Sequence, residues 1–551
     1  MSTVYEIRPE SMPLCIDVIN ELYDFIENFD AALLDKKQVE KIRNRITKAH
    51  KGTPPRNIEL LKAYRLLIKE GKIEPNDFVL SHIIKRRVRS LSGIANITVM
   101  MKAYGCPGKC IFCPTQPGMP KSYFSTQPAM LRAVRNDFDA YKQVKTRLNG
   151  LHSQGHDITK IDIRTAGGTW SSYPLDYQEY FVKSIYFALN EGVGEFLDEE
   201  TALKLITEAK LEDLIKINET ANSRCVGLWV ETRPDWVTKE EVLRLRRFGV
   251  TGIELGIQTT DDLVNEFNDR GHGLKESLEA TSLCRSAGLK ICHHIMPNLP
   301  KSTLESDIKS IRDLFSLDGL KPDYIKIYPC VVLPYTRLKD MAEKDPSIYV
   351  PYTDEELIEI LAEIKSQVPE YCRIIRILRD FPSDIVLKGT KTLNLRQIIS
   401  DRGITCRCVR CREIKGVSFE VDKCQLVCKQ YSVTDGEEYF LSFDEIEKDK
   451  LIGLLRLHIP STKTHFIPEL CDAAIVRELH VYGQQQGLKA GNQMSSKSQH
   501  LGFGKRLMLE AEKIAKSKKF KKLAVISAIG TREYYEKLGY TLEGTYMVKY
   551  L

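Results

Sequence analysis

Three cysteines lie close together in the run Cys106-Pro-Gly-Lys-Cys110-Ile-Phe-Cys113. Thiolates at the spacing C-x3-C-x2-C on one loop can ligate three irons of a 4Fe-4S cluster, which leaves the fourth iron open to an outside ligand. On the motif alone, a structural zinc site and buried free thiols are the alternatives. The spacing favours an iron–sulfur cluster that is part of a catalytic centre, with Cys106, Cys110 and Cys113 as its ligands.

A second group of cysteines is Cys406-Arg-Cys408-Val-Arg-Cys411. Three thiolates within six residues suit one tetrahedral zinc ion, which needs a fourth ligand. Cys424, Cys428, a histidine from elsewhere or a water molecule could supply it. Surface or core thiols are the alternative, and we predict a zinc site at a domain junction.

A glycine-rich turn, Gln499-His-Leu-Gly502-Phe-Gly504-Lys505, precedes a helix expected over residues 503–517. Backbone N–H groups and the positive end of the helix dipole at such a turn suit a pyrophosphate. Further along, Tyr535 stands directly before Glu-Lys-Leu-Gly. The alternatives are a plain helix start and a tyrosine packed in a core.

The elements that must position these residues alternate between short apolar strands and helices from residue 94 to about 382, which indicates a parallel sheet. Expected strands cover residues 97–101, 160–165, 227–231, 252–257, 290–296 and 324–328, and helices 240–248 and 274–287 fall between them. The pattern is α/β and suits a full or partial βα barrel of the TIM type, with its chemistry at the C-terminal strand ends.

The whole chain is expected to divide into four parts. Residues 1–80 form a basic helical segment, residues 81–400 the barrel and residues 401–415 the zinc-binding junction. Residues 416–551 form an α+β domain of antiparallel strands around one long helix.

Glycines and polar residues end several of the expected barrel strands. Gly167 and Gly168 follow the second strand, Glu231 ends the third and Gln258 the fourth. Taken singly, each has an ordinary alternative as a turn or a satisfied polar residue. Together they predict a binding site at the barrel mouth. Lys326 and Tyr328, on a late strand, are predicted substrate contacts, and core or surface roles are equally open to them.

Composition and charge limit the classes of protein to which the chain can belong. With 551 residues, 42% of them hydrophobic, the chain is neither disordered throughout nor a lone peptide-binding module. The net charge is only +7, but residues 36–89 hold 16 Lys and Arg against 5 Asp and Glu. Four cations, Lys85, Arg86, Arg87 and Arg89, directly precede the first cysteine group. We predict that they contact substrate phosphates, with a solvated surface as the alternative.

The first 20 residues contain neither the apolar core of a signal peptide nor a membrane-spanning segment. We therefore expect a cytoplasmic protein without a membrane partner. In that reducing compartment its 15 cysteines are metal ligands or buried thiols rather than disulfides.

The cysteine motif at the top of the first strand, followed by Ala166-Gly-Gly-Thr169 at the end of the second, resembles the radical S-adenosylmethionine enzymes. The resemblance implies that S-adenosylmethionine binds the open iron. It also implies that Gly167 and Gly168 present carbonyls to the amino group of this cofactor, and that Glu231 and Gln258 contribute to the same site.

The C-terminal strand 475–482, the Q-x-x-G-x-G turn and the segment around Tyr535 resemble the GNAT acetyltransferase superfamily. In that superfamily the matching tyrosine points at the coenzyme A sulfur, which implies a catalytic role for Tyr535. The two modules in one chain are similar to the family of the catalytic subunit of Elongator. Further support comes from Glu231-Thr-Arg-Pro-Asp235, Asn268-Asp-Arg-Gly-His272 and Met296-Pro-Asn-Leu-Pro300.

Membership of that family implies a tRNA-modifying enzyme that installs a carboxymethyl group on the wobble uridine, with acetyl-CoA as the acyl source. Its partners would be the tRNA anticodon stem-loop and an electron donor such as ferredoxin or flavodoxin, and self-association is a further expectation. The implied acetyl-CoA contacts are Lys160, Glu478, Leu479, His480, Val481, Phe503, Gly504, Lys505 and Tyr535.

Two features depart from the common family pattern. The interval between the first two cluster cysteines is short, and Pro114-Thr-Gln-Pro-Gly118 replaces the glycines that often follow the third. The compact group of Cys406, Cys408 and Cys411 resembles the archaeal and bacterial branch.

Two other functions remain as alternatives. One is a protein lysine acetyltransferase in which the iron–sulfur cluster is only structural. The other is a tRNA-binding scaffold with decayed sites. Acetyl transfer to peptides by a Cys106→Ala variant would favour the first, and the intact cysteine motif and tyrosine argue against the second.

Overall fold

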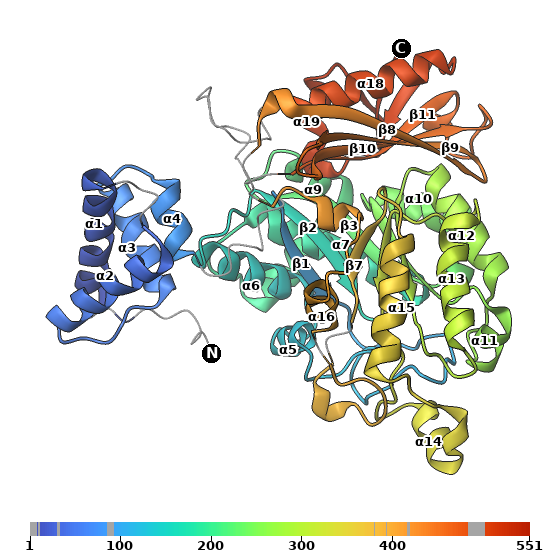
Figure 1. Cartoon of the computed structure of the whole chain (residues 1–551). Helices are drawn as coiled ribbons and strands as arrows, with labels where there is room; N and C mark the ends of the chain where they lie inside the picture. Colours follow the sequence, from blue (N-terminus) through green and yellow to red (C-terminus); the bar gives the residue numbers. More distant parts are fainter. Residues whose placement is uncertain are drawn as a thin grey trace.

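The computed structural model describes residues 8, 11–29, 34–84, 93–378, 381–392, 394–415, 419–482 and 502–551. Figure 1 shows a small helical body near the N-terminus, a curled parallel sheet with outer helices in the centre, and a second sheet packed over one end of it. Among the described helices, none is long and apolar enough to cross a membrane.

The N-terminal body consists of four helices, as the apolar periodicity of its sequence predicts. They are α1 (Met12–Asn28), α2 (Lys36–Ala49), α3 (Asn57–Lys69) and α4 (Asp77–Ile83). Leu14, Val18 and Leu60 belong to a core that is separate from the barrel core. The body contacts the barrel through α3, where Arg65 Nη2 donates to the carbonyl of His152 at 2.6 Å.

The central sheet is an open half-barrel of seven parallel strands in sequential order. The strands are β1 (Ala95–Met100), β2 (Lys160–Ala166), β3 (Arg224–Thr232), β4 (Gly252–Gln258), β5 (Lys290–Ile295), β6 (Tyr324–Ile327) and β7 (Arg373–Arg376). The six predicted strands are therefore confirmed. The seventh was not predicted, because its two apolar residues, Ile374 and Ile375, lie between two arginines and form no clear apolar run.

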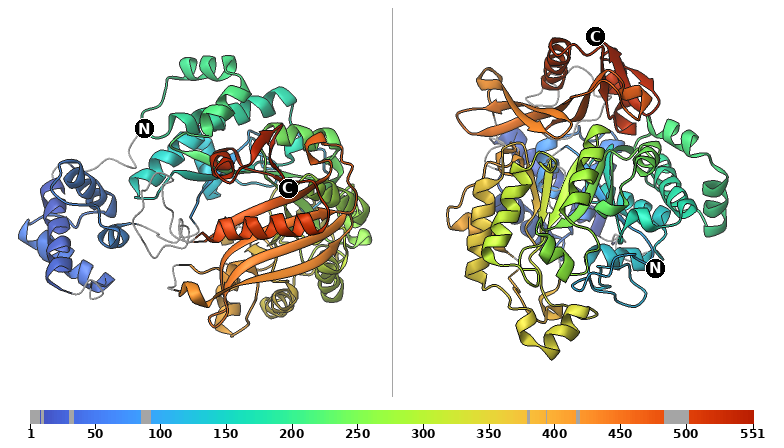
Figure 2. Two further views of the ribbon diagram at one scale, coloured as in Figure 1. Left: turned by 90° about the horizontal axis from the view of Figure 1, so that it is seen from above. Right: turned by 90° about the vertical axis from the view of Figure 1, so that its right-hand side faces the viewer.

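The connections between the strands form the outer layer of the half-barrel (Figure 2). Their helices are α5 (Pro128–Arg135), α6 (Ala140–Ser153), α7 (Leu175–Glu191), α8 (Glu199–Glu208), α9 (Leu211–Asn218), α10 (Lys239–Arg247), α11 (Asp262–Phe267), α12 (Leu274–Ser286), α13 (Leu304–Ser316), α14 (Arg337–Lys344) and α15 (Asp354–Gln367). The short helices α16 (Leu395–Asp401) and α17 (Val409–Arg412) follow β7.

The inner face of the half-barrel is polar. Side chains at alternate positions of a strand lie on opposite faces of the sheet. In β2, Ile161 and Ile163 are fully buried in the core beneath the outer helices, whereas Asp162 and Arg164 line a cavity on the inner face. The interior is therefore a charged channel, unlike the layered apolar core of a closed TIM barrel.

The C-terminal domain is a second seven-stranded sheet. Its strands are β8 (Cys424–Val433), β9 (Gly436–Glu445), β10 (Lys450–Pro460), β11 (Ala473–Val481), β12 (Lys522–Val525), β13 (Thr541–Glu543) and β14 (Tyr546–Tyr550), with helices α18 (Phe503–Ser517) and α19 (Arg532–Glu536). The predicted long helix is confirmed. The strands are not all antiparallel, because β11 and β12 pair in parallel and are joined through α18.

The second sheet covers the N-terminal edge of the barrel strands. Arg532 forms an ion pair with Glu219, which precedes β3, and the Tyr546 hydroxyl donates to the carbonyl of Ala287, which precedes β5. Deeper in the interface, Arg477 of β11 forms a bidentate ion pair at 2.6 and 2.8 Å with Asp323, which precedes β6. These contacts fix the C-terminal sheet over the end of the charged channel.

Candidate functional site

One cavity of about 1090 Å³ extends along the inside of the half-barrel. At the C-terminal edge of the strands it is lined by the cysteine loop, and at the N-terminal edge by β11, the start of α18 and residues 534–535. The predicted residues that line it are Cys106, Cys110, Cys113, Lys160, Gly168, Glu231, Gln258, Lys326, Tyr328, Glu478, Leu479, His480, Val481, Gly504, Lys505 and Tyr535.

Hydrogen-bond donors surround the cysteine loop. Cys110 Sγ accepts from Arg270 Nη1 at 3.1 Å, and Cys106 Sγ accepts from the backbone N–H of Gly108 at 3.4 Å. Arg233 Nη1 is buried without a hydrogen-bond partner among the described residues, and a Cβ at Gly108 would lie 2.4 Å from it. Three thiols with cationic donors around them fit an anionic iron–sulfur cluster, whose potential depends on such hydrogen bonds.

The glycine pair after β2 opens onto the same end of the cavity. Gly168 has a φ of +112°, and a Cβ there would meet no atom within 4 Å, so this position leaves room for a ligand. Gly167, with a φ of +137°, packs against Met101 instead and does not line the cavity. Its carbonyl already accepts the Tyr173 hydroxyl at 2.7 Å, so only its second lone pair remains for a cofactor.

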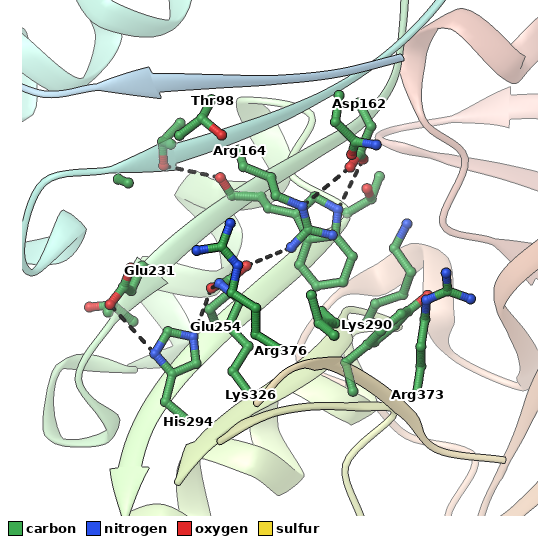
Figure 3. Close-up of a pocket in the computed structure, with 18 of the residues that line it drawn as sticks. Thr98, Asp162, Arg164, Glu231, Glu254, Lys290, His294, Lys326, Arg373 and Arg376 are labelled. Atoms are coloured by element: carbon green, nitrogen blue, oxygen red, sulfur yellow. Dashed lines mark hydrogen bonds and ion pairs between the residues drawn. The ribbon is translucent and has the colours of Figure 1, made fainter. Parts of the chain in front are cut away.

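Ion pairs occupy the middle of the channel (Figure 3). The Glu254 carboxylate accepts from Arg164 Nη1 at 2.6 Å, is 2.7 Å from His294 Nε2 and also binds Lys326 Nζ. Burial opposes the charge on Glu254, but these three neighbours together hold its pKa well below the usual range. Glu231 Oε1 lies 3.6 Å from the other ring nitrogen of His294.

The predicted substrate contacts Lys326 and Tyr328 flank this group. Burial would lower the pKa of Lys326, but the Glu254 charge raises it above the usual value, so Lys326 remains a cation. The Tyr328 ring packs edge-on against His294. Further cations of the cavity lining include Lys290, Arg373, Arg376 and Arg410. Positively charged side chains attract phosphate groups.

At the other end of the cavity, strands β11 and β12 separate. Their pairing ends at Val476, opposite Val525, whereas β11 continues to pair with β10 as far as Val481. Residues 478–481 line the cavity beyond that point. Burial opposes the charge on Glu478, but Arg456 and Lys290 lower its pKa, and its carboxylate accepts from Arg456 Nε at 2.8 Å.

The start of α18 and one tyrosine complete this end. Gly502, at a φ of +75°, precedes the helix, and a Cβ at Gly504 would lie 2.8 Å from the Tyr534 hydroxyl. Burial raises the pKa of Tyr535, so its phenol stays protonated and can donate. Burial lowers the pKa of Lys160, at the start of β2. Phe503 points elsewhere: it is buried in the domain core, with its ring 4.9 Å from that of Phe443.

The second cysteine group lies outside the cavity, around α17. The Sγ atoms of Cys406, Cys408 and Cys411 lie within 4.8 Å of one another, which fits ligands of a single ion with Zn–S bonds of about 2.3 Å. Two of the proposed fourth ligands do not join them in the structure. Cys424 Sγ donates to the Glu420 carbonyl at 3.3 Å, and Cys428 is exposed on β8.

The sequence comparisons agree with this geometry. Residues 177–314 match the family model of the Radical SAM superfamily, and residues 322–403 match that of the Radical_SAM C-terminal domain. The chain is 37% identical to the tRNA uridine(34) acetyltransferase of Methanocaldococcus jannaschii, over 99% of both chains. It is 40% identical to that of Dehalococcoides mccartyi, over 85% of this chain and 100% of the relative.

Eukaryotic relatives are similar over nearly the same length. The Elongator complex protein 3 of Schizosaccharomyces pombe is 33% identical, over 98% of both chains. The chain belongs to the family of Elongator complex protein 3 and the tRNA uridine(34) acetyltransferases. A solved structure of the archaeal Methanocaldococcus infernus Elp3, with an N-terminal deletion, matches with a TM-score of 0.70 and 35% identity. The match covers 84% of this chain and all of that one.

Several residues that line the channel or contact the cysteine loop were not among the site residues predicted from the sequence. Asp162, Arg164, Glu254 and His294 line the channel, and Arg270 contacts a cluster cysteine. The signal for the strand residues was present in Lys160-Ile-Asp-Ile-Arg164, where charged and apolar residues alternate. Of the predicted residues, Lys85, Arg86, Arg87 and Arg89 lie outside the described part of the chain.

Proposed function

We propose that this protein forms 5-carboxymethyluridine at the wobble position of tRNA, from acetyl-CoA, by radical S-adenosylmethionine chemistry. The names of its relatives, tRNA uridine(34) acetyltransferase, support the substrate and the acyl group. The observation that carries the proposal is the single cavity, with a thiol loop at one end and the β11–α18 site at the other. Such a reaction needs both reactants held close together in one space.

In this proposal, Cys106, Cys110 and Cys113 hold a 4Fe-4S cluster. When bound, the cluster and S-adenosylmethionine supply a 5′-deoxyadenosyl radical that abstracts hydrogen. Gly168, Glu231 and Gln258 bind the cofactor at the strand ends, and Gly167 contributes only the second lone pair of its carbonyl. Arg270 and Arg233 stabilise the anionic cluster through their guanidinium groups.

Acetyl-CoA binds at the opposite end. At the N-terminus of α18, the backbone N–H groups of Phe503, Gly504 and Lys505 bind the pyrophosphate. Glu478, Leu479, His480 and Val481 border the pantetheine arm, Lys160 contacts the acyl group, and Tyr535 directs its hydroxyl to the thioester. The acetyl methyl carbon would lose one hydrogen atom to the deoxyadenosyl radical and join carbon 5 of uridine. Carbon 5 would then lose its hydrogen as a proton, one electron would return to the cluster, and water would release coenzyme A to leave a carboxylate.

The uridine enters the charged middle of the channel, where Lys326 and Tyr328 contact it. Lys85, Arg86, Arg87 and Arg89 bind the phosphates of the anticodon stem-loop, with an affinity that falls as salt rises. A ferredoxin or flavodoxin supplies electrons, the enzyme works in the cytoplasm, and copies of the chain self-associate.

The test is anaerobic reconstitution with iron and sulfide, followed by incubation with S-adenosylmethionine, dithionite, acetyl-CoA and tRNA. Nucleoside mass analysis should find carboxymethyluridine only when all components are present. Acetylated peptides formed without a cluster would support the lysine acetyltransferase instead.

A Tyr535→Phe substitution is expected to lower carboxymethyluridine formation about tenfold, as expected for a lost hydrogen bond of about 1.4 kcal/mol. The formation of 5′-deoxyadenosine, measured without tRNA, should continue, because Tyr535 lies at the other end of the cavity. The matched control is Tyr540→Phe: its hydroxyl donates to Glu512 at 2.9 Å and it does not line the cavity. Equal turnover of the Tyr535 variant and wild type would exclude the proposed role.

We also propose that Cys406, Cys408 and Cys411 bind zinc and stabilise the junction between the two sheets. A Cys408→Ser variant should lose most of its zinc by elemental analysis, and its thermal unfolding midpoint should fall by several degrees. Cys471→Ser is the control, since Cys471 lies outside the group. Unchanged zinc content in the Cys408 variant would contradict the proposal that these cysteines bind zinc.

A further inference from the structure

A second cavity, of about 770 Å³, reaches the cysteine loop from another side. It is lined by residues of the loop itself and by the segment 334–340, which leads into α14, and no barrel strand contributes to it. It shares Cys106, Cys110 and Cys113 with the main channel. Figures 1 and 2 place α14 at the end of the molecule opposite the C-terminal sheet.

The rim of this second cavity is fixed to the cysteine loop by three hydrogen bonds. The backbone N–H of Thr115 donates to the Tyr335 carbonyl at 2.9 Å, and that of Leu338 donates to the Ile111 carbonyl at 2.8 Å. Arg337 Nη1 donates to the Lys109 carbonyl at 3.0 Å. The rim and the thiols therefore form one rigid surface.

The exposed groups of this rim are an aromatic ring and several cations. Tyr335 is 55% exposed and has a φ of +59°, an unusual conformation for a bulky residue. Exposed tyrosines are enriched at protein interfaces. The side chains that line the cavity include four cations and one acid, namely Lys109, Lys121, Arg337, Lys339 and Asp340.

Nearby acids only partly balance these charges. Arg337 pairs with Asp269 at 2.6 Å, and Lys339 pairs with Glu343 at 3.1 Å and with Asp340 at 3.7 Å. Lys109 is exposed and forms no ion pair with any described residue. An acidic protein surface would therefore be attracted here.

We propose that this rim, consisting of Lys109, Tyr335, Arg337 and Lys339, is the docking surface for an acidic one-electron carrier protein. The inference rests on the proposed function, because it requires a cluster at the cysteine loop. The main channel is then filled by cofactor, acetyl-CoA and base, so electrons must arrive from another side. In each transfer the reduced carrier loses one electron, the oxidised cluster gains it, and no bond or proton moves.

The experiment uses the reconstituted full-length enzyme and a reduced acidic flavodoxin as the probe. Cluster reduction is followed by the loss of its visible absorbance in stopped flow, without tRNA or acetyl-CoA. A Lys339→Glu variant should be reduced about tenfold more slowly, and raising the salt should affect wild type more than the variant. Tyr335→Asn, which tolerates a positive φ, should also slow the reaction.

Lys344→Glu is the matched control, because Lys344 is exposed on the same helix but does not line the cavity. Its reduction rate should stay close to that of wild type. Dithionite, a small reductant, should reduce all variants equally and show that the cluster is intact.

Three results would overturn the proposal. If flavodoxin reduces Lys339→Glu and wild type at the same rate while dithionite reduces both, the docking surface is wrong and the proposed function stands. If Lys339→Glu weakens tRNA binding in a filter assay and leaves reduction unchanged, the rim binds nucleic acid instead. If the wild-type protein takes up no cluster, both proposals fail.

Discussion

A Cys110→Ala variant is expected to produce no detectable carboxymethyluridine, a loss of at least about 10³-fold, or about 4 kcal/mol of barrier. Cys110 is one of only three proposed thiolate ligands, and it accepts a hydrogen bond from Arg270 at 3.1 Å. Without it the cluster loses a ligand, and the guanidinium beside it loses its anionic partner. Nucleoside mass analysis after anaerobic incubation measures the modified base, and iron analysis measures the cluster.

The control for this variant is Cys471→Ala, which removes a partly exposed thiol that does not line the cavity. It should retain the iron content and the turnover of wild type. Carboxymethyluridine formed by Cys110→Ala at a rate within tenfold of wild type would contradict the radical mechanism. Peptide acetylation that survives in the same variant would point to a GNAT activity independent of the cluster.

The second large effect is expected for Arg477→Met at the interface of the two sheets. Arg477 and its partners Asp323 and Glu438 are completely buried, and its guanidinium binds both carboxylates. Removing one partner of a buried ion pair destabilises a protein by about 3–5 kcal/mol, because the other charges remain desolvated. We expect a matching fall in the free energy of unfolding, measured by urea denaturation and circular dichroism.

This loss should depend on pH. Burial opposes the charge on Asp323 and Glu438, but Arg477 lowers the pKa of both below their ordinary values of 3.8 and 4.5. A carboxyl group whose pKa is lower in the folded than in the unfolded protein stabilises the folded state at pH values above its unfolded-state pKa. This stabilisation disappears as the pH falls toward the folded-state pKa. The difference between wild type and Arg477→Met should therefore be complete at pH 7 and shrink below about pH 4.

An exposed arginine provides the comparison. Arg402 forms a similar bidentate pair with Glu355, at 2.8 Å for both bonds, but on the surface. Arg402→Met should change the free energy of unfolding by less than about 1 kcal/mol. If the two variants were equally stable, burial would not be the source of the stabilisation at Arg477.

Much of this fold was predictable because its signals are local. Strands with flanking turns, such as β2 and β4, can be predicted from their apolar composition. The cysteine spacing identified the thiol loop. In β7 the two apolar residues, Ile374 and Ile375, lie between arginines, so its sequence shows no strand pattern. The parallel pairing of β11 with β12 depends on which strand edge is free in three dimensions, which sequence does not encode locally.

The sequence could not predict that one cavity joins both edges of the barrel sheet, because this too depends on packing in three dimensions. Residues at the C-terminal strand ends were expected to carry the chemistry, and Gly168, Glu231 and Gln258 do line the cavity there. Lys160, however, begins β2, at the opposite edge of the sheet. Only the packing of the C-terminal sheet on that edge, through contacts such as Arg532 with Glu219, makes the channel between the edges continuous.

Because the thiol loop and the β11–α18 site lie at opposite ends of the same strands, the length of these strands sets the distance between them. A strand of seven residues such as β2 is about 20 Å long, and hydrogen bonds to its neighbours keep that length constant. Loops at either edge can lengthen, shorten or change sequence without altering the separation. The rims could thus diverge among relatives while the distance between the thiol loop and the β11–α18 site stayed the same.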